Sequence, residues 1–487
     1  MKYLADFVIE LDSPLHIGTG RDTAVTDAPA FRDAFDLYRI PGTSLAGVLR
    51  AAVRDSAAGE EAAQRIFGTI EDEDENPRGS RLMVSDGYLL DWDNTVALSK
   101  VMNGREPRFP LNPIIQDCVC LEPETGTARE GGKFDLEIVP QGTRFAARLE
   151  YAPQDSDSLD VLKQLMVDLQ QGNLQVGGCT TRGLGYFHAQ QVKLYSCDDT
   201  TPEGLDAWRR RPHRFLEDPP DALSRVDLPD GGLHSTHHAR GISGSVRITF
   251  RTDGPLLVGG NQAPFTDEDV DADLTFAEYP VANYENGELE YRLTVPGASL
   301  KGVLRHRAYH ALRCLDVGEI DKTLGELFGR VEGDDARQSK VRVRGCTLEA
   351  DRSACTVVPH VAIDRLTGGA LDGALYSEAP LWQDGTPVPV ELRVDDLSDA
   401  EAALLLHSLL DLGRGRAPIG GGTRRGSGTL RFADGDFYGA DVRFSLHRNG
   451  RSFNHQSSRR ELQELLDTVS GAFSEEFAER TPSDENM

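Results

Sequence analysis

Hydrophobic and polar residues alternate along several short segments of the chain, and this pattern predicts β-strands. Residues 245–251 (SVRITFR) alternate cleanly, and residues 3–11 (YLADFVIEL) alternate in part, as strands with one buried face do. Further strands are predicted at 81–85, 145–151, 341–348 and 389–394.

A second pattern, in which apolar residues recur every three or four positions, predicts helices. Two of these helices follow Pro-Gly turns at 41–44 and 296–299. Ser44 and Ser299 lie near their N-terminal ends, where a hydroxyl can cap free backbone N–H groups. Helices are also predicted at 158–171, 398–412 and 459–473.

Many of these segments occur twice. Six blocks recur in the same order: SPLHIGTG (13–20), IPGTSLAGVLRAAV (40–53), RIFG (65–68), SRLMVSDG (80–87), VCLEPETG (119–126) and GGCTTRGLGYF (177–187). Their counterparts are GPLLVGGN (254–261), VPGASLKGVLRHRA (295–308), ELFG (326–329), SKVRVRGC (339–346), VAIDRLTG (361–368) and GGGTRRGSGTL (420–430). Because chance would not preserve the order of all six, the chain is predicted to contain two copies of one domain.

The two domains are predicted at 1–197 and 241–448. The segment 198–240 between them has the Pro- and Asp-rich composition of a linker, although Trp208 and Phe215 could pin part of it to a surface. Residues 449–487 are predicted to hold a C-terminal helix and an acidic tail. Strands and helices are interspersed within each copy, which predicts an α+β fold of the ferredoxin-like type with long insertions.

The composition indicates a soluble protein. A chain of 487 residues can hold two to four domains, and no apolar run approaches the roughly 20 residues of a membrane helix. Acidic residues near the N-terminus argue against a signal peptide. Seven cysteines without framework spacing predict reduced thiols and a cytoplasmic location. The 79 acidic and 52 basic residues give a net charge of −27, which taken alone argues against a nucleic-acid-binding protein.

Two features of the repeat could nevertheless bind phosphate. Glycines can let backbone N–H groups approach an anion, and arginine can bind a phosphate through two hydrogen bonds. Such residues cluster in the last block of each copy: Gly178, Arg182 and Gly183, and then Gly421, Arg424, Arg425 and Gly426. The alternative is a tight turn between helix and strand. The predicted helix starts, with Arg50 in one copy and Lys301 and Arg305 in the other, form a second candidate, with ordinary capping as the alternative.

The order of LHIG, IPGTSLAGVLR, FG, RLMVSD and a terminal GG–T–RG–G loop resembles the RAMP superfamily. More narrowly, it resembles the backbone subunits of type III CRISPR effector complexes. Both copies carry this order, so the chain resembles a fused double backbone subunit of the type III-D-like kind. The resemblance implies two tandem RNA-recognition-like RAMP domains, which grip the guide RNA backbone through the Gly-rich loop and the helix start.

The resemblance also implies thumb hairpins that insert between guide and target at every sixth nucleotide. The candidates are the segments around VCLEPETG and VAIDRLTG, where Leu121, Ile363 and Leu366 could wedge between base pairs. The alternative is a surface hairpin that packs on a neighbouring domain.

In catalytically competent members of this family, an aspartate in the loop before the PGxSLKG helix supports metal-dependent cleavage of target RNA. The TDAP stretch makes Asp27 the best match in the first copy, while Asp273 is the first choice and Asp271 the second in the other copy. The resemblance implies that Asp27 and Asp273 bind Mg²⁺ or Mn²⁺, so that the 2′-hydroxyl of the RNA can attack the scissile phosphate. The alternative is that both loops are simply solvated.

Three functions remain open. The first is an RNA-guided endoribonuclease subunit that cuts target RNA at a spacing of about six nucleotides, and the second is a non-catalytic guide scaffold in the same complex. The third, a stand-alone nuclease that processes precursor guide RNA, is disfavoured because the repeat suggests a filament. The implied partners are guide crRNA, complementary target RNA, further backbone subunits, a large signalling subunit and small subunits.

The charge can now be interpreted differently. Basic residues are concentrated in the segments predicted to face RNA, whereas acidic residues crowd the loops, the linker and the tail. Net charge governs solubility and nonspecific binding rather than the field inside a groove. The charge of −27 therefore argues against a free-standing, promiscuous RNA binder and favours a subunit. A salt-adapted host would produce the same surplus.

Overall fold

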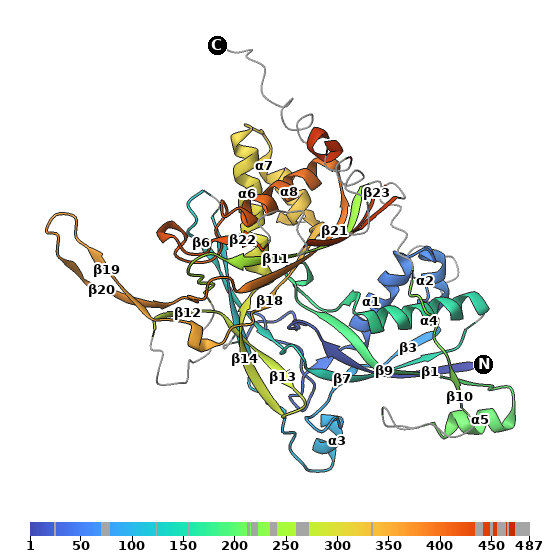
Figure 1. Cartoon of the computed structure of the whole chain (residues 1–487). Coiled ribbons are helices and arrows are strands. Elements are labelled where there is room, and N and C mark those ends of the chain that lie inside the picture. The colour runs from blue at the N-terminus through green and yellow to red at the C-terminus, as the bar shows by residue number, and fades with distance from the viewer. Residues whose placement is uncertain are drawn as a thin grey trace.

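A computed structural model describes most of the chain, and its strands and helices form two α+β units (Figure 1). The described residues are 1–23, 26–69, 78–122, 124–153, 155–211, 215, 223–233, 241–259, 272–332, 335–433, 442–448, 451–454, 464 and 467–472. Within these ranges, no helix combines the length and apolar character needed to cross a membrane.

The first unit is built on a sheet with the strand order β10–β9–β1–β7–β4–β2, to which β3 and β8 are also paired. The strands are β1 (Lys2–Leu11), β2 (Arg39–Ile40), β3 (Leu82–Val84), β4 (Gly87–Leu89), β7 (Arg144–Tyr151), β8 (Leu174–Gln175), β9 (Tyr186–Cys197) and β10 (Ser224–Val226). Three helices, α1 (Gly42–Arg54), α2 (Gly59–Phe67) and α4 (Ser156–Gln171), bury apolar side chains in the same core as this sheet. The predicted strand at 3–11 and the predicted helix at 158–171 are confirmed.

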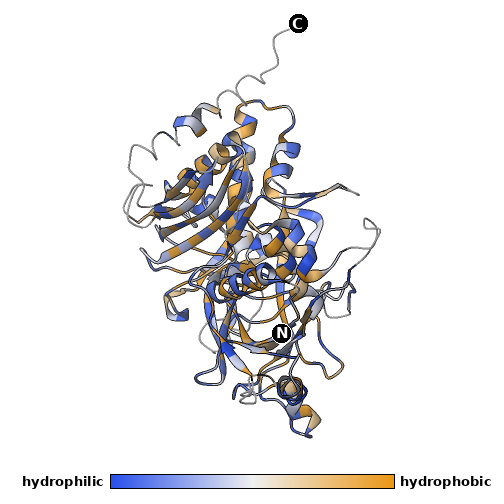
Figure 2. Ribbon diagram, turned by 90° about the vertical axis from the view of Figure 1, so that its right-hand side faces the viewer, coloured by the Kyte–Doolittle hydropathy of each residue, from blue (hydrophilic) through white to orange (hydrophobic). Residues whose placement is uncertain are grey.

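The second unit repeats this plan, with the strand order β17–β21–β11–β23–β24 and with β22 also paired to β11. The strands are β11 (Ile242–Thr252), β17 (Val341–Arg344), β21 (Pro387–Leu397), β22 (Leu430–Phe432), β23 (Val442–Arg448) and β24 (Arg451–Asn454), and the helices are α6 (Gly297–Cys314), α7 (Ile320–Phe328) and α8 (Asp399–Gly413). Hydrophobic and hydrophilic residues alternate along these strands (Figure 2). Helix α8 begins at a capping box formed by Ser398 and Glu401, which satisfies backbone groups that the first helical turn leaves free.

Equivalent backbone pairings show that the two units are copies. Leu15 bridges Val139 in the first unit, and Leu256 bridges Leu381 in the second. Likewise, Gly18 bridges Ala30, and Gly259 bridges Phe276. These pairings align the first block of each copy and extend the alignment into segments where the residue types differ.

Each unit carries a long hairpin as an insertion, formed by β5 (Ile114–Leu121) with β6 (Ala128–Ile138), and by β19 (Val358–Ile363) with β20 (Ala370–Ala379). The prediction of extended hairpins around VCLEPETG and VAIDRLTG is thus confirmed. A short helix, α3 (Ala97–Met102), lies between β4 and the first hairpin. Shorter elements of the two units are η1 (Thr180–Arg182), β12 (Leu274–Thr275), β15 (Arg330–Glu332), β16 (Asp335–Arg337), β18 (Cys346–Thr347), η2 (Arg352–Ala354) and η3 (Thr423–Arg425).

The segment predicted as a linker contributes structure of its own. It contains α5 (Pro202–Arg209), and its strand β10 pairs with β9. Trp208 is buried against Leu4 and Leu223, as a pinning role for this residue requires. Of the predicted C-terminal helix, only part lies within the described residues, and there Val469 is buried in the second core.

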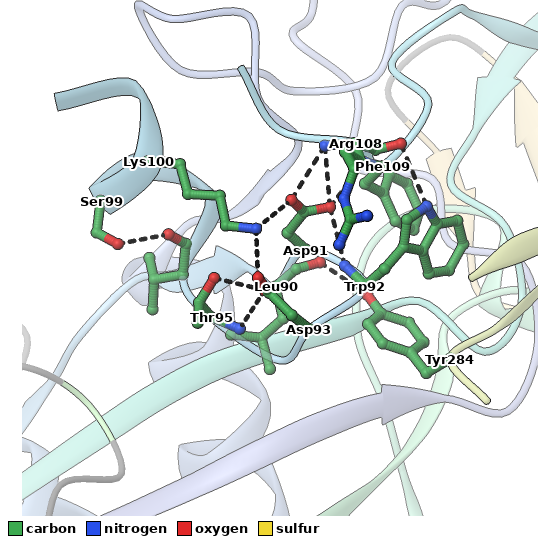
Figure 3. Close-up of polar contacts among 11 residues, drawn as sticks. Leu90, Asp91, Trp92, Asp93, Thr95, Ser99, Lys100, Arg108, Phe109 and Tyr284 are labelled. Carbon is green, nitrogen blue, oxygen red and sulfur yellow. Dashed lines mark hydrogen bonds and ion pairs between the residues drawn. The ribbon is translucent and has the colours of Figure 1, made fainter. Parts of the chain in front are cut away.

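A hairpin of the second unit locks the two units together. It consists of β13 (Glu278–Asn283) and β14 (Glu288–Val295), and its turn places Tyr284 beside Trp92 and Phe109 of the first unit, with ring centroids 5.0 and 6.4 Å away (Figure 3). The Tyr284 hydroxyl donates to the carbonyl of Leu90 at 2.8 Å and accepts from the amide of Arg144 at 3.2 Å. The joint is therefore both apolar and hydrogen-bonded.

A buried carboxylate shapes the pocket that receives Tyr284 (Figure 3). Asp91 is fully buried and accepts hydrogen bonds from Lys100 Nζ at 2.7 Å and from the backbone amide of Phe109 at 2.8 Å. Burial alone would raise the pKa of Asp91, but the hydrogen bonds from Lys100 and from backbone amides outweigh it and lower that pKa. These bonds fix the loop that carries Trp92 and Phe109.

We expect Tyr284→Ala to loosen this joint and to lower the free energy of unfolding by about 3 kcal/mol, the lower end of the range for removing a packed aromatic side chain. Tyr284→Phe is the matched control, because it keeps the ring contacts and loses the hydroxyl, at roughly 1 kcal/mol for each hydrogen bond. Denaturant unfolding of the full chain measures both variants. Equal losses for the two would mean that ring packing does not hold the joint.

Candidate nucleic-acid interface

The Gly-rich loop of the first unit packs against the second unit, and its residue Gly183 is buried in the joint between them. Residues 180–182 form η1, and Gly183 follows in the left-handed region at φ +92. A Cβ atom at Gly183 would lie 2.6 Å from the carbonyl oxygen of Val343 in the second unit. Glycine is required here both by its backbone conformation and by this close approach.

This packing places Arg182 at the start of helix α6. A Cβ atom at Gly297, the first residue of that helix, would lie 2.3 Å from the carbonyl oxygen of Arg182. Arg182, Arg305 and Arg342 are near enough to shift the pKa of Lys301 on the same helix. We call these four residues the joint cations. A helix start and four cations from two units thus form one positive site, which suits a phosphate group.

Lys301 is the most buried of the joint cations, with 9% of its surface exposed. Burial, reinforced by the charges of Arg182, Arg305 and Arg342, lowers its pKa to about 7. An anion placed here would relieve both effects. The adjoining cavity of about 50 Å³, lined in part by Arg182, Gly297 and Ala298, is far too small for a nucleotide, so RNA could reach this site only with a phosphate or another small surface group.

The low pKa of Lys301 predicts a pH effect on the free chain. Between about pH 7 and pH 10.5 the unfolded lysine holds a proton that the folded one lacks, so unfolding takes up a proton and stability rises with pH across this window. In Lys301→Met we expect this rise to be missing. Thermal melts of both chains at several pH values measure the difference, and parallel pH profiles would contradict the assignment.

The corresponding helix start in the first unit differs. There the amide of Gly42 donates to Asp86 Oδ1 at 2.6 Å, and the same carboxylate pairs with Arg39. The block alignment puts Gly345 at the position of Asp86. Arg50, which corresponds to Arg305, pairs with Glu60 at 2.7 Å. The α1 start thus already holds an anion of its own, whereas at the α6 start Gly345 stands in place of that carboxylate.

The sequence predicts Ser44 and Ser299 as caps. Each is the third residue of its helix, after an N-cap at Pro41 or Pro296, and neither N-cap is satisfied by a side-chain hydrogen bond. The predicted capping role is therefore not observed.

The two loop aspartates occupy equivalent places. The amide of Asp135 donates to Asp27 Oδ2 at 3.1 Å, and the amide of Asp27 donates to Asp135 Oδ1 at 2.9 Å. In the second unit, the amide of Ser377 donates to Asp273 Oδ2 at 2.7 Å, and the amide of Asp273 donates to Ser377 Oγ at 3.1 Å. Each aspartate is thus clasped by the second strand of the long hairpin. Asp271, the second choice in that loop, lies outside the described residues.

The arginine of each Gly-rich loop reaches the same strand. Arg182 lies over the ring of Phe134 at 5.3 Å, and Arg425 lies over the ring of Tyr376 at 5.9 Å. Phe134 and Tyr376 directly precede the residues that clasp the aspartates. Arg425 also pairs with Glu378 at 2.6 Å. Aspartate loop, hairpin strand and Gly-rich loop therefore converge in both units, as three sequence blocks far apart in the chain.

These sites offer few ligands for a metal. Among the described residues, no group of three or more His, Cys, Asp or Glu side chains could hold an ion. The first unit offers Asp27 beside Asp135, and the second offers Asp273 beside Ser377. Mg²⁺ often binds through one or two carboxylates and takes its other ligands from water and substrate phosphates, so both sites fit an ion that arrives with RNA.

Sequence reasoning missed Asp135, Ser377 and Arg342, and also the aromatic residues Phe134 and Tyr376. The repeat gave no signal for the first three, because the residue types at these positions differ between the copies. Extending the VCLEPETG and VAIDRLTG alignment along the hairpin strand would have brought Phe134 and Tyr376 together, since both are aromatic. The predicted thumb residues are exposed, with Leu121 at 55%, Ile363 at 54% and Leu366 at 95% of their surface.

The match to a known family follows the same division into two units. The family described as the RAMP superfamily matches residues 8–188 and 249–431. A protein named CRISPR system Cms endoribonuclease Csm3, from Methanocaldococcus jannaschii, is 24% identical over 212 residues, covering 40% of this chain and 80% of the relative. A chain from the solved structure titled Type III-B Cmr-beta, a cryo-EM structure of the apo state, is 13% identical with a TM-score of 0.31, covering 38% of this chain and 96% of that one.

Proposed function

We propose that this chain, which belongs to the RAMP superfamily through both of its units, is a guide-RNA-binding backbone subunit of a type III CRISPR complex that also cleaves target RNA. The observation that carries the proposal is the convergence, in both units, of the aspartate loop, the hairpin strand and the Gly-rich loop. The similarity to a relative named as an endoribonuclease supports the cleavage activity.

Guide binding is assigned to the joint cations and to the Gly-rich loops. Lys301 and Arg305 approach Arg182 where the units meet, so one phosphate could be gripped by both units at once. In the second unit, Arg425 and Gly426 of the Gly-rich loop are exposed, and together with Gly421 they are assigned a second contact with the guide, in which phosphate would compete with Glu378 for Arg425. Because the chain carries 79 acidic residues, positive charge confined to such sites would favour one ordered RNA path over nonspecific binding.

Cleavage is assigned to Asp27 and Asp273, which would hold Mg²⁺ or Mn²⁺. Such an ion, when bound, neutralises charge that develops on the scissile phosphate. The backbone amides of Asp135 and Ser377 donate hydrogen bonds to these carboxylates and so fix their orientation. The 2′-hydroxyl of the target would attack the adjacent phosphorus, and the 5′-oxygen of the next nucleotide would leave. The chain would thus position the attacking 2′-hydroxyl and the leaving 5′-oxygen, and none of its residues would form a covalent intermediate.

The proposed fold of each unit, the role of the hairpins, the partners and the domain boundaries follow from the proposal that the chain is a backbone subunit. Each unit is proposed to have a ferredoxin-like, RNA-recognition-like core, and the two long hairpins are proposed to act as thumbs between guide and target. The partners would be guide crRNA, complementary target RNA, further backbone subunits, a large signalling subunit and small subunits, in the cytoplasm. The boundaries 1–197 and 241–448 are retained for the two domains, although 198–240 contributes β10 to the first sheet.

The test is purification of the assembled complex through a tag on this chain, with sequencing of the RNA it retains. We expect guide RNA of defined length, protected from nuclease, and cleavage of complementary RNA at positions about six nucleotides apart. Guide RNA without cleavage by this subunit would favour the alternative of a structural scaffold. A chain that processes precursor RNA alone would support the stand-alone nuclease and overturn the proposal.

A further inference from the structure

The outward face of the second sheet, opposite the face that packs on its helices, is basic. Successive residues of a strand point to opposite faces, and Ile248 of β11 is buried in the core with the helices. Four arginines on β11, β22 and β23 point the other way and are exposed: Arg247, Arg251, Arg431 and Arg443. We call these four residues the basic face. A chain with 79 acidic and 52 basic residues does not produce such a cluster by composition alone.

The arginines of the basic face lie opposite one another on neighbouring strands. Arg247 is the cross-strand partner of Arg443, and Arg251 is the cross-strand partner of Arg431. Side chains at such positions are close enough to interact, so like charges there destabilise a sheet. Folding alone therefore does not favour this arrangement, whereas an anion held between the two members of a pair would relieve their repulsion.

The carboxylates on this face neutralise its charge only in part. Glu391 lies 3.2 Å from Arg247, but the same carboxylate also lies 3.6 Å from Arg344 and 3.8 Å from Arg393. Within the described part of the chain, Arg443 forms neither a hydrogen bond nor an ion pair. One carboxylate thus serves three guanidinium groups, and the fourth has none.

The second pair is closer to neutrality. Arg431 Nε lies 2.8 Å from a carboxylate oxygen of Asp253, and Arg251 Nη1 donates to the carbonyl of Gly385 at 3.0 Å. The pair Arg247 and Arg443 therefore offers the stronger site for an anion, and the pair Arg251 and Arg431 offers a weaker one.

The first unit has opposite charges at the corresponding place. The bridges made by Leu15 and Leu256 align Asp6 with Arg247. Asp6 is buried, is the cross-strand partner of Arg148, and forms an ion pair with it at 2.6 Å. The two copies of the sheet thus differ here in the sign and in the balance of their charges.

The first unit also covers this face with apolar side chains. Leu4 and Val8 on the same face of β1 are buried, and Leu4 packs against Trp208 from the segment between the units. The corresponding residues of β11 are Ser245 and Thr249, which are polar. The first sheet therefore uses this face for packing, whereas the second sheet leaves it hydrophilic and open to a charged ligand.

An extended polyanion fits the basic face. A guanidinium group can donate two parallel hydrogen bonds to a phosphate, and a phosphate between Arg247 and Arg443 could accept from both. The pair Arg251 and Arg431 lies four residues further along β11, roughly 13 Å away, where a second phosphate of the same strand could bind. No Phe, Tyr or Trp occupies an outward position of β11, β22 or β23, so bases have no ring to stack on. The contacts would be to the backbone and independent of sequence.

We propose that the basic face binds the phosphate backbone of an RNA strand, with one phosphate between Arg247 and Arg443 and another between Arg251 and Arg431. The choice of RNA over an acidic protein segment rests on the proposed function. The proposal adds a binding surface on the second sheet to those at the helix start and the Gly-rich loops. Guide and target share this backbone chemistry, and the experiment distinguishes between them.

The experiment uses the full chain in its purified complex, with the photo-cross-linking residue p-benzoylphenylalanine at position 249. This outward position of β11 lies between the two arginine pairs and leaves both intact. We expect a cross-link to RNA, and sequencing of the attached RNA assigns it to guide or target. Arg247→Gln combined with Arg443→Gln should lower the yield at least about tenfold, because charge-assisted hydrogen bonds are lost.

The matched control is Arg209→Gln combined with Arg210→Gln, which removes two exposed positive charges from α5 and should leave the yield unchanged. A cross-link from position 249 to protein instead of RNA, no cross-link, or equal yields from the two double variants would overturn the proposal. The melting temperature of the free chain should not fall in Arg247→Gln with Arg443→Gln, since the pair repels. A fall that the control does not show would assign these arginines a structural role and overturn the proposal as well.

RNA retained by the same preparation reports on the proposed function separately. Retained guide RNA without a cross-link at position 249 contradicts only the basic face. A preparation without guide RNA contradicts the proposed function, and the basic face is then tested with oligouridylate added to the free chain. A cross-link to that RNA supports the proposal, and its absence overturns it.

Discussion

Asp27→Asn and Asp273→Asn should each abolish one cut in the target RNA and leave the other intact. Asparagine retains an oxygen that can accept from the clasping amide of Asp135 or Ser377 but removes the charge that a divalent ion needs. Loss of such electrostatic stabilisation typically slows a reaction about 100-fold or more. Cleavage of labelled target by the assembled complex with Mg²⁺ measures both variants, and the two abolished cuts should lie about six nucleotides apart.

The matched control is Asp22→Asn, which makes the same change of charge at an exposed position in the first loop. It should cut at both positions, and all the variants should retain guide RNA. If both single variants and the double variant cut normally, the subunit is a scaffold. If only Asp27→Asn loses a cut, a second carboxylate such as Asp135 is required, because the second site has Ser377 there.

Arg182→Gln combined with Lys301→Met should weaken guide binding at least about 100-fold, since each charge-assisted hydrogen bond contributes roughly 1.5–3 kcal/mol. The dependence of affinity on salt should also become shallower, by about 0.7 in the log–log slope for each phosphate that the variant no longer neutralises. Competition of the bound guide at several salt concentrations measures both quantities. Removing these two charges should not lower the free energy of unfolding, because Arg182 and Lys301 repel each other in the folded chain.

Lys322→Glu is the control for this pair, because it changes charge on the exposed surface of α7, away from the joint. It should leave the salt slope unchanged. A double variant that releases guide RNA no faster than the control, with the same slope, would show that the joint cations do not contact phosphate. Guide binding would then have to be reassigned to the Gly-rich loop of the second unit, which carries Arg425.

The repeat and most helices and strands could be predicted because both depend on short-range patterns of residues in the sequence. Strand β11 and helix α4 follow from periodicity alone, and the first block of each copy makes equivalent backbone pairings. The aspartates Asp27 and Asp273 follow from resemblance to a family, yet they occupy the same register against their hairpins. That register depends on long-range strand pairing, which no local pattern contains.

The features that distinguish the copies could not be predicted in the same way. The matching blocks suggested that the two helix starts have the same surroundings. However, the start of α1 binds the carboxylate of Asp86, and the second copy has Gly345 at that position. The aromatic joint around Tyr284 lies in insertions, which an alignment of repeats discards. Reciprocal hydrogen bonds between Asp27 and Asp135 join residues 108 positions apart, and their counterpart in the second unit uses a serine.

The hairpin β13–β14, which carries Tyr284, has a consequence for the reaction products. It fixes the first unit on the second by ring packing and by hydrogen bonds to Leu90 and Arg144, so the separation of Asp27 and Asp273 is set by protein rather than by RNA. The chain would then act as a ruler. The length of the fragment released between its two cuts should stay constant across guides and targets. It should become variable when the contacts of Tyr284 with the first unit are lost.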